Sequence, residues 1–148
     1  MIGAPMKPTL TYRREARIEW GDCDPAGIVF FPRYFAMFDS CTTALFSKAL
    51  GMSKYQFTRH YQFQGYPMVD TKARFVKPTK FGDDVVIETK VAEFRRSSFD
   101  VQHRLSLNGD LCVECFDTRV WVEVDPGNPE RIRSKPIPQE VIAKFGAG

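Results

Sequence analysis

The chain has 148 residues, 43% hydrophobic and 26% charged, with a formal net charge of +3, a size and balance that fit one globular domain. So small a charge gives no reason to expect a nucleic-acid partner. No apolar run approaches the roughly 20 residues that span a bilayer, and residues 1–11 lack the apolar segment of a secretory signal, so we expect a cytoplasmic protein without membrane partners.

Residue patterns predict one long helix between an early strand and four later strands. Tyr12–Trp20 alternates as a half-buried strand does. Pro32–Leu50 is predicted as a helix of about 28 Å, because proline suits a helix start and glycine, here Gly51, its end. The remaining elements are a short helix and loop over Ser53–Gly65, strands over Met68–Lys77, Asp84–Phe94, Ser98–Leu107 and Leu111–Val124, an end to the last strand at Asp125–Pro129, and a short helix over Pro138–Phe145.

The predicted helix over residues 32–50 is apolar on most of its surface, so other segments must wrap it. Antiparallel strands on one side of such a helix give an α+β fold, a curved antiparallel sheet around a central helix. We expect a single domain over residues 1–148, with residues 1–10 as a flexible tail. The 13 Phe residues favour an oligomer whose sheets join edge to edge.

The four cysteines favour free thiols in a reducing compartment. Cys112 and Cys115 lie three residues apart in a predicted strand, which should point their side chains to opposite faces. A single pair also lacks the second pair of ligands that a structural zinc site needs. We therefore expect neither a metal nor a cofactor.

The stretch Gly21–Pro32 is the strongest candidate for chemistry. Its carboxylates, glycines and prolines form a predicted turn that leads directly into the helix, whose first N–H groups are free. A carboxylate beside free N–H groups suits attack on a carbonyl, because the N–H groups stabilise the oxygen that becomes negative. Asp24 is the candidate carboxylate, although Asp before Pro is also common in Asx turns, and the spacing alone leaves the two interpretations open.

The run Gly21-Asp22-Cys23-Asp24-Pro25-Ala26-Gly27-Ile28-Val29-Phe30-Phe31-Pro32-Arg33-Tyr34 resembles the signature of hot-dog-fold acyl-CoA thioesterases, most closely the 4-hydroxybenzoyl-CoA thioesterase type. A second block, Glu93-Phe94-Arg95-Arg96-Ser97-Ser98-Phe99, also resembles that family. The resemblance extends over about residues 12–124. It implies the hot-dog fold and a homodimer or homotetramer with active sites at the subunit interface.

The resemblance also implies the site residues. Asp24 takes the place of the catalytic carboxylate, and the N–H of Phe31 takes the place of the group that polarises the thioester carbonyl. Asp39 falls in the acyl pocket, and Arg95 and Arg96 fall where the family meets CoA phosphates. The chain departs from the family pattern at two positions, where Ser97 replaces a lysine and Phe31 replaces a frequent tyrosine. Tyr66 lies where the family lines its acyl pocket, which makes it a candidate substrate contact.

Other polar residues have simpler interpretations. Asp22 is expected to bond the loop backbone, and Cys23 lacks the nearby His that would make it a nucleophile. His103 alternates with apolar residues, which favours a satisfied core histidine, and His60 is expected to be exposed. Asp39 is costly on an apolar helix without a partner, and either capping of another segment or contact with a substrate hydroxyl accounts for it.

The expected function is therefore hydrolysis of an aromatic acyl-CoA such as 4-hydroxybenzoyl-CoA, with Asp24 as nucleophile or general base. CoA is part of the substrate and no separate cofactor is expected. Two alternatives stay open. One is a thioesterase for short aliphatic acyl-CoA or acyl carrier protein, and the other is a non-catalytic hot-dog protein that binds CoA esters.

Overall fold

The computed structural model describes residues 7–146 of the chain. The helices are α1 (Pro32–Leu50), α2 (Lys54–His60) and α3 (Gln139–Ala143), with a short 3₁₀ turn at Trp20–Asp22. The strands are β1 (Thr11–Arg17), β2 (Met68–Phe75), β3 (Asp84–Phe94), β4 (Ser98–Leu107), β5 (Asp110–Val120), β6 (Val122–Asp125) and β7 (Asn128–Ser134).

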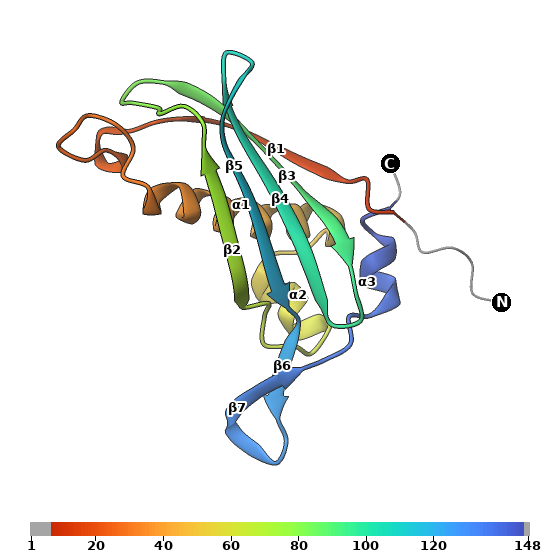
Figure 1. Ribbon diagram of the computed structural model, residues 1–148. Helices are drawn as coiled ribbons and strands as arrows, with labels where there is room; N and C mark the ends of the chain where they lie inside the picture. The colour runs from red at the N-terminus through yellow and green to blue at the C-terminus, as the bar shows by residue number, and fades with distance from the viewer. Residues whose placement is uncertain (1–6, 147–148) are drawn as a thin grey trace.

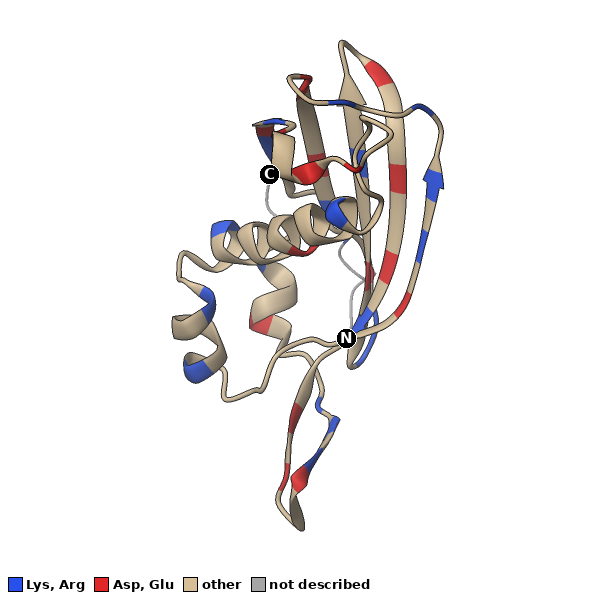
Figure 2. Ribbon diagram, turned by 90° about the vertical axis from the view of Figure 1, so that its left-hand side faces the viewer, with Lys and Arg blue, Asp and Glu red and all other residues tan. Residues whose placement is uncertain are grey.

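Five strands form one antiparallel sheet in the order β1-β3-β4-β5-β2, and β6 and β7 form a separate hairpin (Figure 1). Helix α1 lies against one face of this sheet, and no helix of the described chain covers the other face (Figure 2). On that open face Arg104 donates to Glu114 at 2.6 Å. The predicted α+β arrangement of a sheet around a central helix is confirmed.

Helix α1 has the boundaries that the sequence predicts. Pro32 occupies its first turn, and Gly51 ends it with φ +68° while its N–H donates to the carbonyl of Ser47. The side chains that face the sheet recur every three or four residues and are fully or nearly fully buried. Burial of that stripe, more than helix propensity, stabilises a helix of this length.

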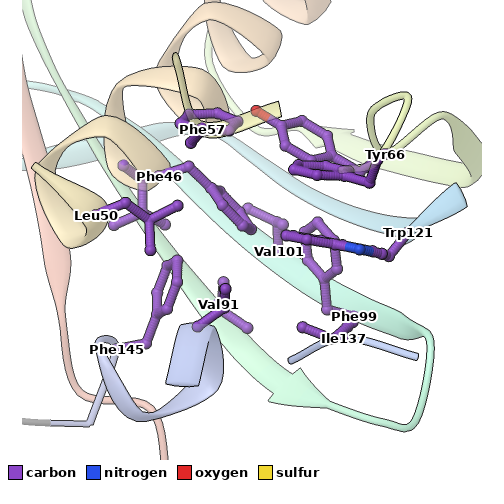
Figure 3. Close-up of a cluster of buried hydrophobic side chains, with 13 residues drawn as sticks. Phe46, Leu50, Phe57, Tyr66, Val91, Phe99, Val101, Trp121, Ile137 and Phe145 are labelled. Carbon is purple, nitrogen blue, oxygen red and sulfur yellow. The ribbon is translucent and has the colours of Figure 1, made fainter. Parts of the chain in front are cut away.

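The C-terminal half of α1 packs into an aromatic core (Figure 3). The Phe46 ring lies 4.8 Å from the rings of Tyr66 and Phe145 and 5.2 Å from that of Phe99. Trp121 stacks on Phe63 at 3.6 Å beside them. Helices α2 and α3 therefore close this end of the helix against the sheet.

The strand predicted over Leu111–Val124 is divided, and one strand escapes prediction. β5 ends at Val120, β6 follows, and Asp125–Asn128 turns the chain into β7 rather than ending the sheet structure. β7 was missed because nearly all of its side chains are exposed and polar, so no apolar alternation marks it. The first strand ends at Arg17, not Trp20, because residues 20–22 form the 3₁₀ turn.

The prediction that Cys112 and Cys115 point to opposite faces is wrong. Both side chains are buried in the same core cluster. The register shows why, since Leu105 pairs with Val113 while Ser106 pairs with Leu111, which leaves Cys112 as the extra residue of a bulge. All four cysteines, which lie within residues 7–146, are free as predicted.

The two ends of the described chain meet. The N–H groups of Thr9 and Leu10 donate to the carbonyl of Phe145 at 2.9 and 3.0 Å. These residues are therefore fixed, which differs from the predicted flexible tail over residues 1–10; residues 1–6 lie outside the described part. None of the helices within residues 7–146 has the length and hydropathy to span a membrane.

Candidate active site

The segment between β1 and α1 folds as a small hairpin held at both of its edges. The Phe30 N–H donates to the Asp22 carbonyl at 2.8 Å, and the Asp24 N–H donates to the Ile28 carbonyl at 3.0 Å. Val29 is buried, and its N–H donates to the Thr79 carbonyl of the next loop. These bonds hold the carboxylate of this hairpin and the start of α1 in one rigid segment.

Asp24 occupies the first position of the tip turn. The Gly27 N–H donates to its carbonyl at 2.9 Å, with Pro25 second in the turn and Gly27 at φ +85°, a combination typical of short hairpins. The Ala26 N–H donates to Asp24 Oδ1 at 2.8 Å, so the Asx turn is present. Among residues 7–146 no hydrogen bond reaches Oδ2, which leaves one oxygen of this half-buried carboxylate open.

Phe31 precedes the first residue of α1 and has helical backbone angles, φ −51° and ψ −35°. Its carbonyl accepts from Tyr34, but its N–H has no hydrogen-bond partner among residues 7–146. Residues before proline avoid the helical region, so the hairpin must hold Phe31 there against the preference imposed by Pro32. The chain thus fixes a free N–H at the positive end of a 19-residue helix.

Aromatic rings surround this helix start without burying it. The Phe31 ring lies 5.7 Å from Phe30, 6.3 Å from Phe35 and 6.5 Å from Phe75. Phe31 itself is 56% exposed, and Phe30 and Phe75 are similarly exposed. An open apolar patch of this kind is typical of a ligand site or a subunit interface.

Asp22 bonds the loop backbone as predicted. Its Oδ2 accepts from the Glu19 N–H at 2.9 Å and caps the 3₁₀ turn.

Asp39 finds its partner on the sheet. Arg119, on the inner face of β5, donates from Nη2 to Asp39 Oδ1 at 2.6 Å. At about 1.5 Å per residue, Asp39 lies roughly 10 Å along α1 from Pro32. Sequence analysis missed Arg119; the signal was its place in the alternating run Val113, Cys115, Asp117, Arg119, all of whose side chains face the core.

A second buried polar network spans the sheet beneath α1. Both ring nitrogens of His103 lie at hydrogen-bond distance from a side chain. Nδ1 is 2.8 Å from Thr89 Oγ1, and Nε2 is 3.1 Å from Asp117 Oδ2. Burial lowers the pKa of His103, so we assign a neutral ring that donates from Nε2 to Asp117. The prediction of a satisfied core histidine is confirmed.

Asp117 is ionised within this network. Burial raises the pKa of its carboxyl, but hydrogen bonds from His103 and Thr71 outweigh burial and leave that pKa below its ordinary value. The Thr71 hydroxyl donates to Oδ1 at 2.6 Å, and the Cys115 thiol donates to the same oxygen at 3.3 Å. The network is internally satisfied, which fits a structural contribution.

The two arginines of the β3–β4 turn differ. Arg95 forms a two-pronged ion pair with Asp100 at 2.8 and 2.7 Å and also bonds Glu93 and Ser98, and the Asp100 hydrogen bond raises the pKa of Arg95. Arg96 is exposed and its guanidinium has no partner among residues 7–146.

Ser97 and Tyr66 each hold part of the framework through a backbone carbonyl. The Ser97 carbonyl accepts from the Trp121 N–H at 2.7 Å. Tyr66 is buried in the aromatic core, where burial raises the pKa of its hydroxyl to about 12. It is therefore not an open pocket wall in the single chain, and it reaches the candidate site through its carbonyl, which accepts from Arg119 Nη1 at 3.2 Å.

One chain does not bring all predicted site residues together. Arg17 pairs with Asp84 at the start of β3, beside the Asp24 hairpin, whereas Arg95 follows the end of β3. At about 3.3 Å per residue the 11 residues of β3 separate these regions by more than 30 Å. Figure 1 shows the Asp24 hairpin and the β3–β4 turn at opposite ends of the sheet. Within residues 7–146, no group of three or more His, Cys, Asp or Glu residues is placed to hold a metal ion.

Comparison with known proteins assigns the family. Residues 18–145 match the thioesterase-like superfamily. This chain belongs to that superfamily. The 4-hydroxybenzoyl-CoA thioesterase of Pseudomonas sp. (strain CBS-3) is 36% identical over 134 residues, 86% of this chain and 92% of its own. The 1,4-dihydroxy-2-naphthoyl-CoA hydrolase of Synechococcus elongatus is 30% identical over 97 residues, 66% of this chain and 71% of its own.

Solved structures of thioesterases have the same fold as this chain. The crystal structure of an Asp-to-Asn mutant of 4-hydroxybenzoyl-CoA thioesterase, complexed with 4-hydroxybenzoyl-CoA, has a TM-score of 0.83 and 31% identity, covering 91% of this chain and 98% of that chain. A gentisyl-coenzyme A thioesterase has a TM-score of 0.75 and 28% identity, covering 88% and 98%. The hot-dog fold and the thioester hydrolase class predicted from the sequence are confirmed.

Proposed function

We propose that this thioesterase hydrolyses a hydroxylated aromatic acyl-CoA, with 4-hydroxybenzoyl-CoA as the first candidate, and that Asp24 and the Phe31 N–H carry the reaction. The observation that supports this most directly is the hairpin before α1. It holds a carboxylate with one open oxygen and a helix-start N–H without a partner in the same rigid segment.

The chemistry follows from these two groups. The Phe31 N–H donates to the thioester carbonyl oxygen and stabilises the negative charge that develops on it. Asp24 either attacks the carbonyl carbon or takes a proton from an attacking water. In the first route the C–S bond breaks, CoA leaves as thiolate, and water then hydrolyses the Asp24 anhydride to carboxylate and free acid. A thiol with an ordinary pKa near 8.5 leaves without a strong acid, so neither a metal nor a further cofactor is required.

The aromatic, hydroxylated acyl group is inferred from two sources. The names of the relatives describe 4-hydroxybenzoyl, 1,4-dihydroxy-2-naphthoyl and gentisyl esters of coenzyme A. In this chain, the exposed rings of Phe31 and Phe75 offer an aromatic surface at the helix start. Asp39 offers a hydrogen-bond acceptor two turns further along the helix.

We further propose that the active unit contains at least two chains, as a homodimer or homotetramer. More than 30 Å of β3 separates the Asp24 hairpin from the arginine turn in one chain. An arginine turn of a second chain is therefore needed to bind the CoA of an ester held at Asp24. Strand β2 at the sheet edge, with Val69 and Phe75 exposed, is the surface that a second sheet would extend.

For the phosphates of CoA we propose Arg96 as the main contact. The Arg95 guanidinium is already held by Asp100, so Arg95 shapes the turn. Arg96 is free to pair with phosphate oxygens. Ser97, whose hydroxyl has no hydrogen-bond partner among residues 7–146, can add one neutral hydrogen bond where the family pattern has a lysine.

A thiol-release assay tests this proposal. Purified protein is given 4-hydroxybenzoyl-CoA, benzoyl-CoA and butyryl-CoA, and free CoA is measured by its reaction with a thiol reagent. We expect the highest kcat/KM with the hydroxylated aromatic ester. Preference for butyryl-CoA would favour an aliphatic thioesterase, and CoA-ester binding without release from any of the three would favour a non-catalytic binder.

A further inference from the structure

We propose that Arg119 is a specificity-determining positioning residue that fixes Asp39 so that one carboxylate oxygen faces a hydroxyl donor on the acyl group. The inference rests on the proposed function and deepens it. It adds a residue that does not touch the reacting atoms and that decides which acyl groups fit.

Arg119 links strand β5 to helix α1 through its bond to Asp39. It stands opposite Phe99 in the β4–β5 register, on the face that packs against the helix. Its guanidinium donates from Nη2 to Asp39 Oδ1 at 2.6 Å and from Nη1 to the Tyr66 carbonyl at 3.2 Å, and it lies 5.6 Å from the centre of the Tyr66 ring. Two hydrogen bonds and a ring contact leave this guanidinium little freedom to move.

The burial of the pair is strongly asymmetric. The Arg119 side chain is 6% exposed, whereas the Asp39 side chain is 63% exposed. A guanidinium keeps its proton inside a protein, so its charge must be balanced by an anion placed within reach. Asp39 is the carboxylate bonded to it among the described residues. The buried cation therefore fixes an anion that remains open on the other side.

One donor of the Arg119 guanidinium lacks a partner among the described residues. Its Nε is buried and has no hydrogen-bond partner among residues 7–146. Leaving a buried donor unpaired is unfavourable. The side chain thus reaches Asp39 and the Tyr66 carbonyl while its buried Nε donor stays unpaired within the described chain. That placement points to a requirement on Asp39.

The hydrogen-bonding capacity of Asp39 determines which acyl groups it can bind. A carboxylate paired at Oδ1 can only accept at Oδ2. When a bound acyl group covers Asp39, a hydroxyl on that group donates to Oδ2, and the same group without the hydroxyl leaves Oδ2 unpaired. Sites built to hydrogen-bond a substrate hydroxyl discriminate strongly against the analogue that lacks it. Without the hydrogen bond from Arg119, the Asp39 side chain is free to rotate on the exposed side of α1. The discrimination between the hydroxylated acyl group and the group without a hydroxyl should then fall.

The test compares kcat/KM for 4-hydroxybenzoyl-CoA with kcat/KM for benzoyl-CoA in four proteins: wild type, Asp39→Asn, Arg119→Met and the double variant. We expect each single variant to lower the ratio about tenfold or more, chiefly through the hydroxylated ester, and the double variant to lower it no further than the larger single effect. A matched control, Arg104→Met on the open face of the sheet, should leave the ratio unchanged.

Arg119→Lys keeps the charge but cannot bond Asp39 and the Tyr66 carbonyl together as the planar guanidinium does. This variant tests the inference if Arg119→Met fails to fold. We expect its ratio to lie between those of wild type and Asp39→Asn. An unchanged ratio in a folded Arg119 variant, with thiol release from both esters, would overturn the inference and leave the thioesterase proposal intact. Absence of thiol release from both esters in the wild-type protein would instead overturn the proposed function.

Discussion

The two ends of α1 use the same residue type in opposite ways. Near the C-terminal end, Phe46 is completely buried among the rings of Tyr66, Phe99 and Phe145. At the N-terminal end, Phe31 touches three other rings and still stays 56% exposed. The first cluster closes the fold, and the second is left open around a free N–H.

The difference separates the part of the chain that stabilises the fold from the part that we propose to be functional. At the closed end four buried apolar side chains of the C-terminal region join the aromatic core: Trp121, Ile137, Val141 and Phe145. At the open end the hairpin holds Phe31 in a conformation that the following proline disfavours. Conformations of that kind persist where the surrounding structure determines them, and they gather at functional sites.

Truncation of the rings should give the largest effect on stability. Phe46→Ala should lower the free energy of unfolding by about 3–5 kcal/mol, because it leaves a cavity among packed rings. Phe31→Ala should lower it by less than about 1 kcal/mol, since the exposed ring loses few contacts. Urea titrations at equal protein concentration measure both. Equal losses in the two variants would contradict the distinction between the two ends.

A proline at position 31 removes both the ring and the N–H, so its comparison with alanine, which removes the ring alone, isolates the contribution of the N–H. Phe31→Pro fits the φ of −51° and breaks no hydrogen bond recorded within residues 7–146. We expect kcat for thiol release to fall about 10²–10³-fold, the usual effect of losing one oxyanion donor. Phe31→Ala keeps the N–H and serves as the matched control, with kcat within a few-fold of wild type. Similar kcat values in the proline and alanine variants would show that this N–H has no part in the reaction.

The arginine turn should show a smaller and different effect. Arg96→Ala should raise KM for the CoA ester about tenfold with little change in kcat, because the lost contact binds ground state and transition state alike. Arg95→Ala should act mainly through the turn, as a lowered melting temperature, since its guanidinium holds Asp100. Steady-state kinetics together with thermal unfolding separate the two. A larger KM effect from Arg95 than from Arg96 would reverse the assignment.

The parts of the fold that could be predicted are those marked by local sequence signals. Pro32, the apolar surface of the helix and Gly51 fixed both ends of α1, and the β3–β4 strands were placed to the residue. Sequence analysis missed β7, which carries no apolar alternation, and the bulge at Cys112, which depends on pairing with β4. It also could not find the partner of Asp39, because Arg119 lies 80 residues away and only the sheet register brings the two together.

The geometry of the candidate site was predicted in part, and the catalytic roles of its residues stay predictions. The Asp24 hairpin appears where the motif placed it, and the Asx turn that competed with catalysis as an interpretation is present as well. The two interpretations are compatible, since a turn that holds Oδ1 also orients Oδ2. Arg95, by contrast, was grouped with Arg96 by sequence alone, and only the position of Asp100 distinguishes them.

The most direct test of the central claim is thiol release by Asp24→Asn, measured beside Asp22→Asn and wild type with 4-hydroxybenzoyl-CoA. Both substitutions remove one charge from the same hairpin, so the comparison isolates the position of the carboxylate. We predict that Asp24→Asn lowers kcat by about 10³-fold while the protein still folds and binds the ester, and that Asp22→Asn retains kcat within about tenfold of wild type. Turnover by Asp24→Asn close to that of wild type would contradict the account.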